Sequence, residues 1–184
     1  MQSQTPARLV TKRLILRQWQ DSDLVPFAAL NADPAVMEFF PHCLTREDSD
    51  AMALKIRTLI AEQGWGFWAA EIRDTGAFAG FVGLHRPSAD LPFSPCVEIG
   101  WRLARDHWGQ GLATEGAKAA LTFAFDRLSL PEVVSFTFKD NHRSRAVMER
   151  LGFQNSGEDF NHPALPDGHP LRPHVLYRLQ KPSP

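Results

Sequence analysis

The chain has 184 residues, the size of about one domain, which is long enough to bury a core and leave room for a cleft. Its 20 Lys and Arg balance 21 Asp and Glu, and the net charge of -1 argues against nucleic acid or an anionic membrane as the main partner. No apolar run approaches the ~20 residues that cross a bilayer, and residues 1–11 lack the apolar segment of a signal peptide, so a cytoplasmic protein is expected.

Hydrophobic periodicity and helix-end signals predict strands and helices along the whole chain. Asp21 or Ser22 can cap the first helix, and Thr45 with Asp48 resembles a capping box before the second. In chain order, the predicted elements are a strand at 13–17, helices at 21–31 and 45–62, strands at 66–73, 77–85 and 96–103, a helix at 111–128, a strand at 133–139, a helix at 141–151 and a strand at 174–179.

This order of elements predicts an α/β fold with a mixed sheet. We find no internal repeat, low-complexity tract or linker, so residues 1–184 are expected to form one domain with a core at about 11–179 and loose termini. Several prolines gather late in the chain, and residues 160–173 are therefore expected to form an irregular loop.

The most informative segment follows the strand at 96–103. Residues 108–114 read Trp-Gly-Gln-Gly-Leu-Ala-Thr, a glycine-bearing turn that opens a helix. Glycine lets the backbone approach a ligand closely, and the first N–H groups of a helix have no internal partner and favour an anion. A pyrophosphate is a natural occupant. A tight turn whose glycines serve only chain reversal is the alternative that physics alone leaves open.

This segment resembles the cofactor turn of the GCN5-related N-acetyltransferase (GNAT) superfamily, which has the pattern Q/R-x-x-G-x-G/A after an aliphatic strand end. Gly111 and Ala113 match the fourth and sixth positions, and Leu103 matches the aliphatic one. Trp108 stands where Gln or Arg is usual. The sequence W-G-x-G-x-A-T-E is typical of the branch that acetylates the N-termini of ribosomal proteins (RimJ/RimL-like).

Two further motifs strengthen the resemblance to that branch. Residues 11–17 are similar to its opening T-x-R-L-x-L-R, and residues 141–144 and 149–153 are similar to its later Asn-containing and Gly-Phe segments. The likeness therefore runs from about 11 to 179. It implies a mixed, mostly antiparallel central sheet that is splayed between the strands at 96–103 and 133–139, with helices on both faces.

The resemblance also implies acetyl-CoA as co-substrate and direct acetyl transfer to a primary amine without a covalent enzyme intermediate. No metal is expected, because the two cysteines and seven histidines are scattered without the spacing of metal ligands. The cofactor would lie in the splay, with its pantetheine bonded to the backbone of Trp101 and Leu103 and touching Asn141. Asn141 can cap its helix at the same time. The pyrophosphate would sit on backbone N–H groups of the turn, contributed by Trp108, Gly109, Gln110, Gly111, Leu112, Ala113 and Thr114.

Glu98 is the first candidate for the general base, because it lies beside the expected splay on a strand that often carries a base in this superfamily. Strict alternation places Glu98 opposite Val97, Ile99 and Trp101, which could put it on a solvated or structural face unless a bulge intervenes. A water chain or another acid is the alternative base.

Ser144 is the candidate donor to the departing thiolate. Many members of the superfamily use a Tyr at the position of Met148, which has no acidic proton, and Tyr177 on the final strand is expected to be structural. Ser144 lies one helical turn before Met148 on the same stripe. The alternative is that Ser144 only supports the start of the helix.

The acceptor amine is not named by the sequence. A protein N-terminus or a small-molecule amine is expected, recognised by loops near 86–95 and 154–173, and homodimerisation stays open. Most of the aromatic residues Phe39, Phe40, Trp65, Phe67 and Trp68 are expected to be core, with one or two lining the acceptor pocket. A non-catalytic acyl-CoA sensor is the alternative function, whereas the P-loop pattern of a nucleotide-binding module is absent.

Overall fold

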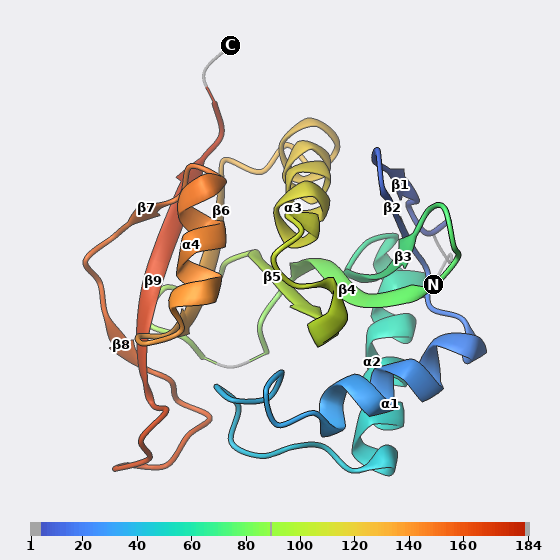
Figure 1. Ribbon diagram of the computed structural model, residues 1–184. Coiled ribbons are helices and arrows are strands. Elements are labelled where there is room, and N and C mark those ends of the chain that lie inside the picture. The colour runs from blue at the N-terminus through green and yellow to red at the C-terminus, as the bar shows by residue number, and fades with distance from the viewer. Residues whose placement is uncertain (1–4, 89, 183–184) are drawn as a thin grey trace.

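The computed structural model describes residues 5–88 and 90–182, and within them nine strands form one sheet in the order β1-β2-β3-β4-β5-β6-β9-β7, with β8 paired to β9 off this path (Figure 1). Neighbouring strands are antiparallel except for β5 and β6, which are parallel. The strands are β1 (Leu9–Val10), β2 (Leu14–Arg17), β3 (Phe67–Ile72), β4 (Phe78–His85), β5 (Glu98–Leu103), β6 (Glu132–Phe138), β7 (Gln154–Asn155), β8 (Phe160–Asn161) and β9 (Pro173–Gln180).

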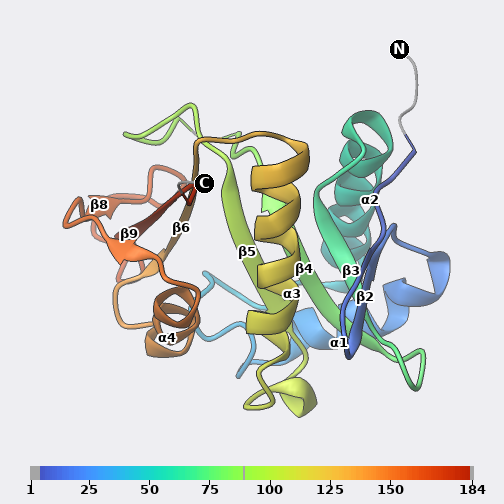
Figure 2. The same cartoon turned by 90° about the horizontal axis from the view of Figure 1, so that it is seen from above.

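Helices cover both faces of the sheet, as expected. The α-helices are α1 (Leu24–Ala32), α2 (Arg46–Gln63), α3 (Leu112–Thr122) and α4 (His142–Arg150). Figure 1 shows α1 and α2 together below the sheet and α3 above it, and Figure 2 shows α3 lying across β4 and β5 with α4 beside β6. The predicted fold class, a mixed and mostly antiparallel sheet between helices, is confirmed.

Side-chain contacts assign the two faces of the central strands. Phe81 of β4 packs against Phe27 of α1, with ring centroids 6.1 Å apart. Gly116 of α3 lies so close to β4 that an added Cβ would stand 3.3 Å from both methyl groups of Val82. Because side chains alternate along a strand, odd and even positions of β4 and β5 face opposite helix layers.

The sheet opens between β5 and β6. These two strands share one register pair, Glu98 with Val134, supported by a hydrogen bond from the Val134 amide to the Val97 carbonyl at 3.0 Å. One residue further along, the Ser135 hydroxyl donates to the Ile99 carbonyl at 3.0 Å. Beyond Ile99 no register pair joins the two strands in the described residues, so the predicted splay is confirmed at its predicted place.

Several predicted boundaries need correction. The first helix begins at Leu24, after a 3-10 turn at 21–23, and the helix expected at 111–128 is α-helical only to Thr122 and continues as a π-helical turn at 123–127. The late loop contains the short strand β8, and β1 and β7 were not expected. These strands have two residues each, too few for a periodic signal.

Thr45 is the N-cap of α2, because the Asp48 amide donates to the Thr45 hydroxyl at 3.1 Å. The reciprocal half of the predicted capping box differs, since the Asp48 carboxylate accepts from the Thr45 hydroxyl at 2.8 Å. The extreme termini expected to be loose, residues 1–4 and 183–184, lie outside the described residues. In the segments that the structure describes, we find no helix with the length and apolarity needed to cross a membrane.

Candidate active site

A cleft of about 1430 Å³ occupies the splay between β5 and β6. Its walls come from these two strands, the start of α3, the start of α4 and the segment that joins α1 to α2. Pockets for one small molecule usually measure about 300–1,000 Å³, so this cleft has room for a large cofactor and an acceptor together.

The turn at the start of α3 has the geometry expected of an anion site. Gly109 and Gly111 adopt φ angles of 71° and 75°, in the left-handed region that favours glycine. No side chain caps the helix, so the amides of Leu112, Ala113 and Thr114 have no intrahelical partner. A Cβ added at Gly109 would meet no heavy atom within 4 Å, so the turn is open to a ligand. A pyrophosphate fits this site.

Trp108 fastens the turn to the end of β5. Its indole Nε1–H donates to the Leu103 carbonyl at 2.8 Å, and the Arg143 guanidinium lies 4.4 Å above its ring. The aromatic residue that replaces the usual Gln or Arg therefore has a positioning contact of its own. The sequence alone could not predict this contact, because it depends on the chain between Leu103 and Trp108 folding back as a turn.

The backbone of β5 offers an edge to the cleft. The Ala104 amide donates to the Ala79 carbonyl at 2.9 Å, and antiparallel alternation then turns the backbone groups of Trp101 and Leu103 away from β4 and toward the gap. Since the Leu103 carbonyl already accepts from Trp108, the backbone of Trp101 and the Leu103 amide are the groups that the described chain leaves for a pantetheine contact.

Glu115 ties the cofactor turn to the hairpin between β1 and β2. Its carboxylate accepts from the Thr11 hydroxyl at 2.6 Å and from the Arg13 amide and Nε at 2.7 Å each. Arg13 also donates from Nη1 to the Gln110 carbonyl at 2.8 Å. The two separate sequence motifs at 11–17 and 108–115 are therefore two halves of one contact, which holds the phosphate turn in place.

We expect Glu115→Gln to lower the melting temperature by about 2–4 °C, a loss of roughly 1 kcal/mol discounted for the partly exposed pair. Burial acts to raise the pKa of Glu115, but hydrogen bonds from Thr11 and Arg13 outweigh it and hold the pKa below its ordinary value. The stabilisation is therefore complete above the ordinary pKa and is lost as pH falls through the lowered one. Thermal melts of both proteins at neutral and acidic pH measure this, and a gap that widens in acid contradicts it.

Glu98 lies on the face of β5 that α1 and α2 cover, together with Gly100 and Arg102. The pairing of β4 with β5 is unbroken through this strand, so no bulge alters the alternation, and the irregular register lies in β3 at Ala70 and Glu71. That face is not open solvent, because it forms the floor of the cleft. Glu98 thus keeps the side predicted by alternation and still reaches the site.

The Glu98 carboxyl group is isolated and half-buried. Among residues 5–88 and 90–182, no hydrogen bond or ion pair reaches its side chain, and Phe67 and the backbone of Gly100 lie beside it. Burial raises the pKa of Glu98 to about 8. A carboxyl group with such a pKa exchanges its proton near neutral pH, which is the range in which a general base is effective.

The start of α4 faces the cleft from the other side. Asn141 caps the helix, since its Oδ1 accepts from the Ser144 amide at 3.2 Å while its Nδ2 donates to the Thr137 hydroxyl at 2.9 Å. Ser144 lines the cleft one turn before Met148, which is 1% exposed. Tyr177 is buried and donates to Glu149 at 3.0 Å, as expected of a structural residue.

An aromatic wall, which sequence reasoning largely missed, lines the cleft with side chains from the α1–α2 segment, β6, β9 and the residue after β8. Phe39 stacks on Phe138 with centroids 5.8 Å apart, and the rings of His162 and His174 lie 4.9 Å apart. Burial lowers the pKa of His174 to about 4 and also lowers the pKa of His162, so both rings are neutral at physiological pH. The aromatic wall consists of Phe39, Phe40, Phe136, Phe138, His162 and His174.

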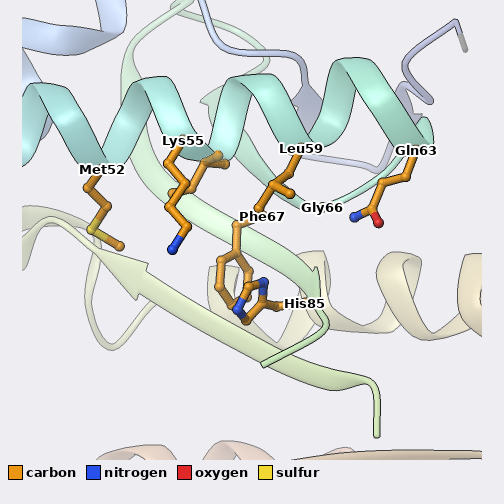
Figure 3. Close-up of a pocket in the computed structure, with 8 residues that line it drawn as sticks. Met52, Lys55, Leu59, Gln63, Gly66, Phe67 and His85 are labelled. Atoms are coloured by element: carbon orange, nitrogen blue, oxygen red, sulfur yellow. The ribbon is translucent and has the colours of Figure 1, made fainter. Parts of the chain in front are cut away.

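A second, smaller pocket of about 160 Å³ lies beneath α2 (Figure 3). Figure 3 shows Met52 and Lys55 reaching from α2 toward Phe67, whose ring stacks on His85 with centroids 5.1 Å apart. Met52 and Phe67 also line the large cleft, so they form the partition between the two spaces. Burial and the Lys55 charge lower the pKa of His85, which keeps this ring neutral.

A mixed sheet that opens beside an uncapped helix N-terminus is the arrangement expected of an acyl-CoA-dependent acyltransferase. The chain belongs to the acetyltransferase (GNAT) domain family, which matches residues 13–154. Members of this family transfer acetyl from acetyl-CoA, and the turn described above fits that co-substrate. The described segments contain no group of three or more His, Cys, Asp and Glu that could hold a metal ion.

The chain is similar over most of its length to known acetyltransferases. The uncharacterized N-acetyltransferase YoaA of Bacillus subtilis is 29% identical over 151 residues, which cover 81% of this chain and 84% of YoaA. The FsC-acetyl coenzyme A-N(2)-transacetylase of Aspergillus fumigatus is 30% identical over 171 residues, covering 84% and 71%. The ribosomal L7/L12 α-N-protein acetyltransferase RimL, solved with coenzyme A, has a TM-score of 0.74 at 18% identity, covering 95% and 98%.

Proposed function

We propose that this protein transfers an acetyl group from acetyl-CoA directly to a primary amine, with Glu98 as general base. The observation that carries the proposal is the half-buried Glu98 carboxyl group, which has no partner in the described chain and whose pKa desolvation raises to about 8, in the same cleft as the phosphate turn. A binding domain without turnover has no need of such a group, whereas an amine must lose a proton before it attacks a thioester.

In the proposed reaction the two substrates meet across β5. The pantetheine arm of acetyl-CoA contacts the backbone of Trp101 and the side of Asn141, with its pyrophosphate on the amides of residues 108–114. The amine enters from the aromatic wall, on the face that carries Glu98. Its nitrogen forms a bond to the acetyl carbon, the carbon–sulfur bond breaks, and the Glu98 carboxylate accepts the proton of the amine.

Transfer without a covalent enzyme intermediate is supported by the state of the nearest thiol. Burial raises the pKa of Cys96 to about 11, with the Glu98 charge as a further cause. A thiol with so high a pKa is almost entirely protonated at neutral pH and is a poor nucleophile. Cys43, the other cysteine, is exposed on the surface.

Ser144 is proposed to donate a hydrogen bond to the departing thiolate. We expect Ser144→Ala to lower kcat by about 10-fold, equivalent to roughly 1.4 kcal/mol, because a thiolate is already a fairly good leaving group. Acetyl-CoA affinity should change little. The measurement combines kcat with the melting temperature of the same preparation. A variant that melts lower but keeps its kcat assigns Ser144 to helix support alone.

The function is tested by following the release of free thiol from acetyl-CoA across a panel of amines. Thiol release that depends on an added amine, with the acetylated amine as product, supports the proposal. Binding of acetyl-CoA without turnover of any amine favours the acyl-CoA sensor instead. Both a protein N-terminus and a small-molecule amine stay within the proposal, as do a cytoplasmic location and a single domain over residues 1–184.

A further inference from the structure

Arg102 is a buried cation that has no anionic partner among the described residues. Its side chain lines the cleft floor on the same face of β5 as Glu98, and the residue is 8% exposed. Nη1 donates to Asn31 Oδ1 at 2.6 Å, and the guanidinium lies 4.1 Å from the centre of the Phe40 ring. Nε is fully covered and has no hydrogen-bond partner in the described chain, and no carboxylate lies within ion-pair distance.

The other buried arginine shows how this chain normally treats such a charge. Arg17 is 9% exposed, and it forms ion pairs with Asp23 at 2.8 Å and with Glu71 at 2.6 Å. Arg102 has a neutral amide and aromatic rings instead. A buried charge without a counterion is costly, and burial lowers the pKa of Arg102 to about 10, which still leaves it a cation at neutral pH.

The cleft does not supply the missing counterion. Its acidic lining residues are Glu98 and Glu115, and Glu115 is bound by Thr11 and Arg13. Glu98 stands four residues away along an extended strand, a Cα separation of roughly 13 Å. Holding the α1–α2 segment against the sheet does not require a positive charge, because a neutral side chain can stack on Phe40 and bond to Asn31.

We propose that Arg102 binds a carboxylate group of the acceptor, so that the acceptor is an amine that also carries a carboxylate several bonds away. This inference rests on the proposed function and names its substrate class. Arg102 and Glu98 share the face that the aromatic wall closes, whereas the cofactor's phosphates belong to the turn at the start of α3. The amine would lie at Glu98, an apolar body against the aromatic wall, and the carboxylate at Arg102.

The separation of the two charged residues restricts this class further. Because the Cα atoms of the two residues are roughly 13 Å apart, an acceptor with a linker between its amine and its carboxylate suits them better than an α-amino acid, which carries both groups on one carbon. Two sources fit: a small ω-amino acid with a flexible chain, and a peptide with an acidic side chain near its free N-terminus. Both present the same chemistry, an amine and a carboxylate joined by an extended linker.

Matched acceptor pairs test the inference. The first pair is 6-aminohexanoate and 6-aminohexanamide. The second is Ala-Ala-Glu and Ala-Ala-Gln, each with an amidated C-terminus, so that the Glu side chain is the single carboxylate. For the wild-type protein, kcat/KM should favour the acid over the amide in at least one pair by about 10-fold or more, the size of a charge-assisted hydrogen bond. The pair that shows the preference identifies the source.

Arg102→Gln should abolish this preference, to within about 2-fold, mainly by raising KM for the acid, since the charge is lost while an N–H donor is kept. Arg102→Lys should retain part of it. Arg46→Gln, which removes one exposed arginine from α2, is the matched control and should keep the full preference. Melting temperatures and acetyl-CoA binding of all variants are measured in parallel.

The outcomes separate the two proposals. Acids and amides that are acetylated equally well by the wild-type protein overturn the inference and leave the function intact. A preference that survives in Arg102→Gln, or an equal fall for acid and amide together with a lower melting temperature, assigns Arg102 to structure and also overturns it. Acetyl-CoA that binds but releases no thiol with any amine of the function panel overturns the proposed function itself.

Discussion

Replacing Glu98 by Gln is expected to lower kcat by about 100-fold or more, which is the usual size of a general-base contribution. The change preserves the shape of the side chain and removes its ability to accept a proton. Acetyl-CoA affinity should barely change, because the turn at the start of α3 is a separate part of the cleft. Glu62→Gln, an exposed change on α2, is the control for the loss of one carboxylate.

The pH dependence identifies Glu98 as the base. A base must be deprotonated to act, and burial raises the pKa of Glu98 to about 8, so kcat/KM should rise with pH and level off above that value. The acceptor amine titrates as well, and two acceptors with different amine pKa values separate the contributions. A limb that stays near pH 8 for both acceptors and vanishes in Glu98→Gln belongs to Glu98. Full activity in the variant excludes Glu98 from the mechanism.

Gly111→Asp is expected to abolish the rise in melting temperature that acetyl-CoA produces. A ligand that binds only the native state raises its stability, so this shift reports cofactor binding directly. The substitution places a carboxylate beside amides that bind the pyrophosphate. Gly111 has a φ of 75°, and an added Cβ would lie 3.6 Å from Arg13 Nη2, so the new side chain also competes for the arginine that supports the turn.

Two controls separate charge from backbone strain. Gly111→Asn has nearly the same shape and the same left-handed conformation without the charge, and it should retain a substantial part of the shift. Gly76→Asp introduces the same residue at a φ of 73° in the loop between β3 and β4, with no heavy atom within 4 Å, and should keep the whole shift. If Gly111→Asp binds acetyl-CoA as tightly as the parent, the turn is not the site.

The sequence predicts the fold and the position of the splay because both depend on local periodicity and ordered motifs. Alternation alone placed Glu98 on the face opposite Ile99, and that proved right, since the register with β4 is unbroken. What alternation could not supply was the identity of the facing layer. A polar residue at a strand position can face either a cleft or open solvent, and the two cases cannot be distinguished until the helices that cover the strand are located.

The residues that sequence reasoning missed are brought together by long-range packing. His162 follows β8 and His174 lies in β9, so the pairing of β8 with β9 brings the two rings together. Glu115 contacts Thr11, which lies 104 residues earlier in the chain. Arg102 carried a readable signal, because it is a charged residue at the same strand face as Glu98. Its lack of a counterion, however, depends on all the elements that pack around it, and a local sequence pattern cannot predict this.

Because of the position of β9 in the sheet, the strands are not synthesised in the order in which they lie side by side. Although it comes last among the strands, β9 lies between β6 and β7 and also pairs with β8. A ribosome adding about 5–20 residues per second completes β6 and α4 seconds before their partner exists. Until residue 180 has left the exit tunnel, the edge of β6 that later pairs with β9 has no strand partner, and the β6 side of the cleft lacks the strand that supports it.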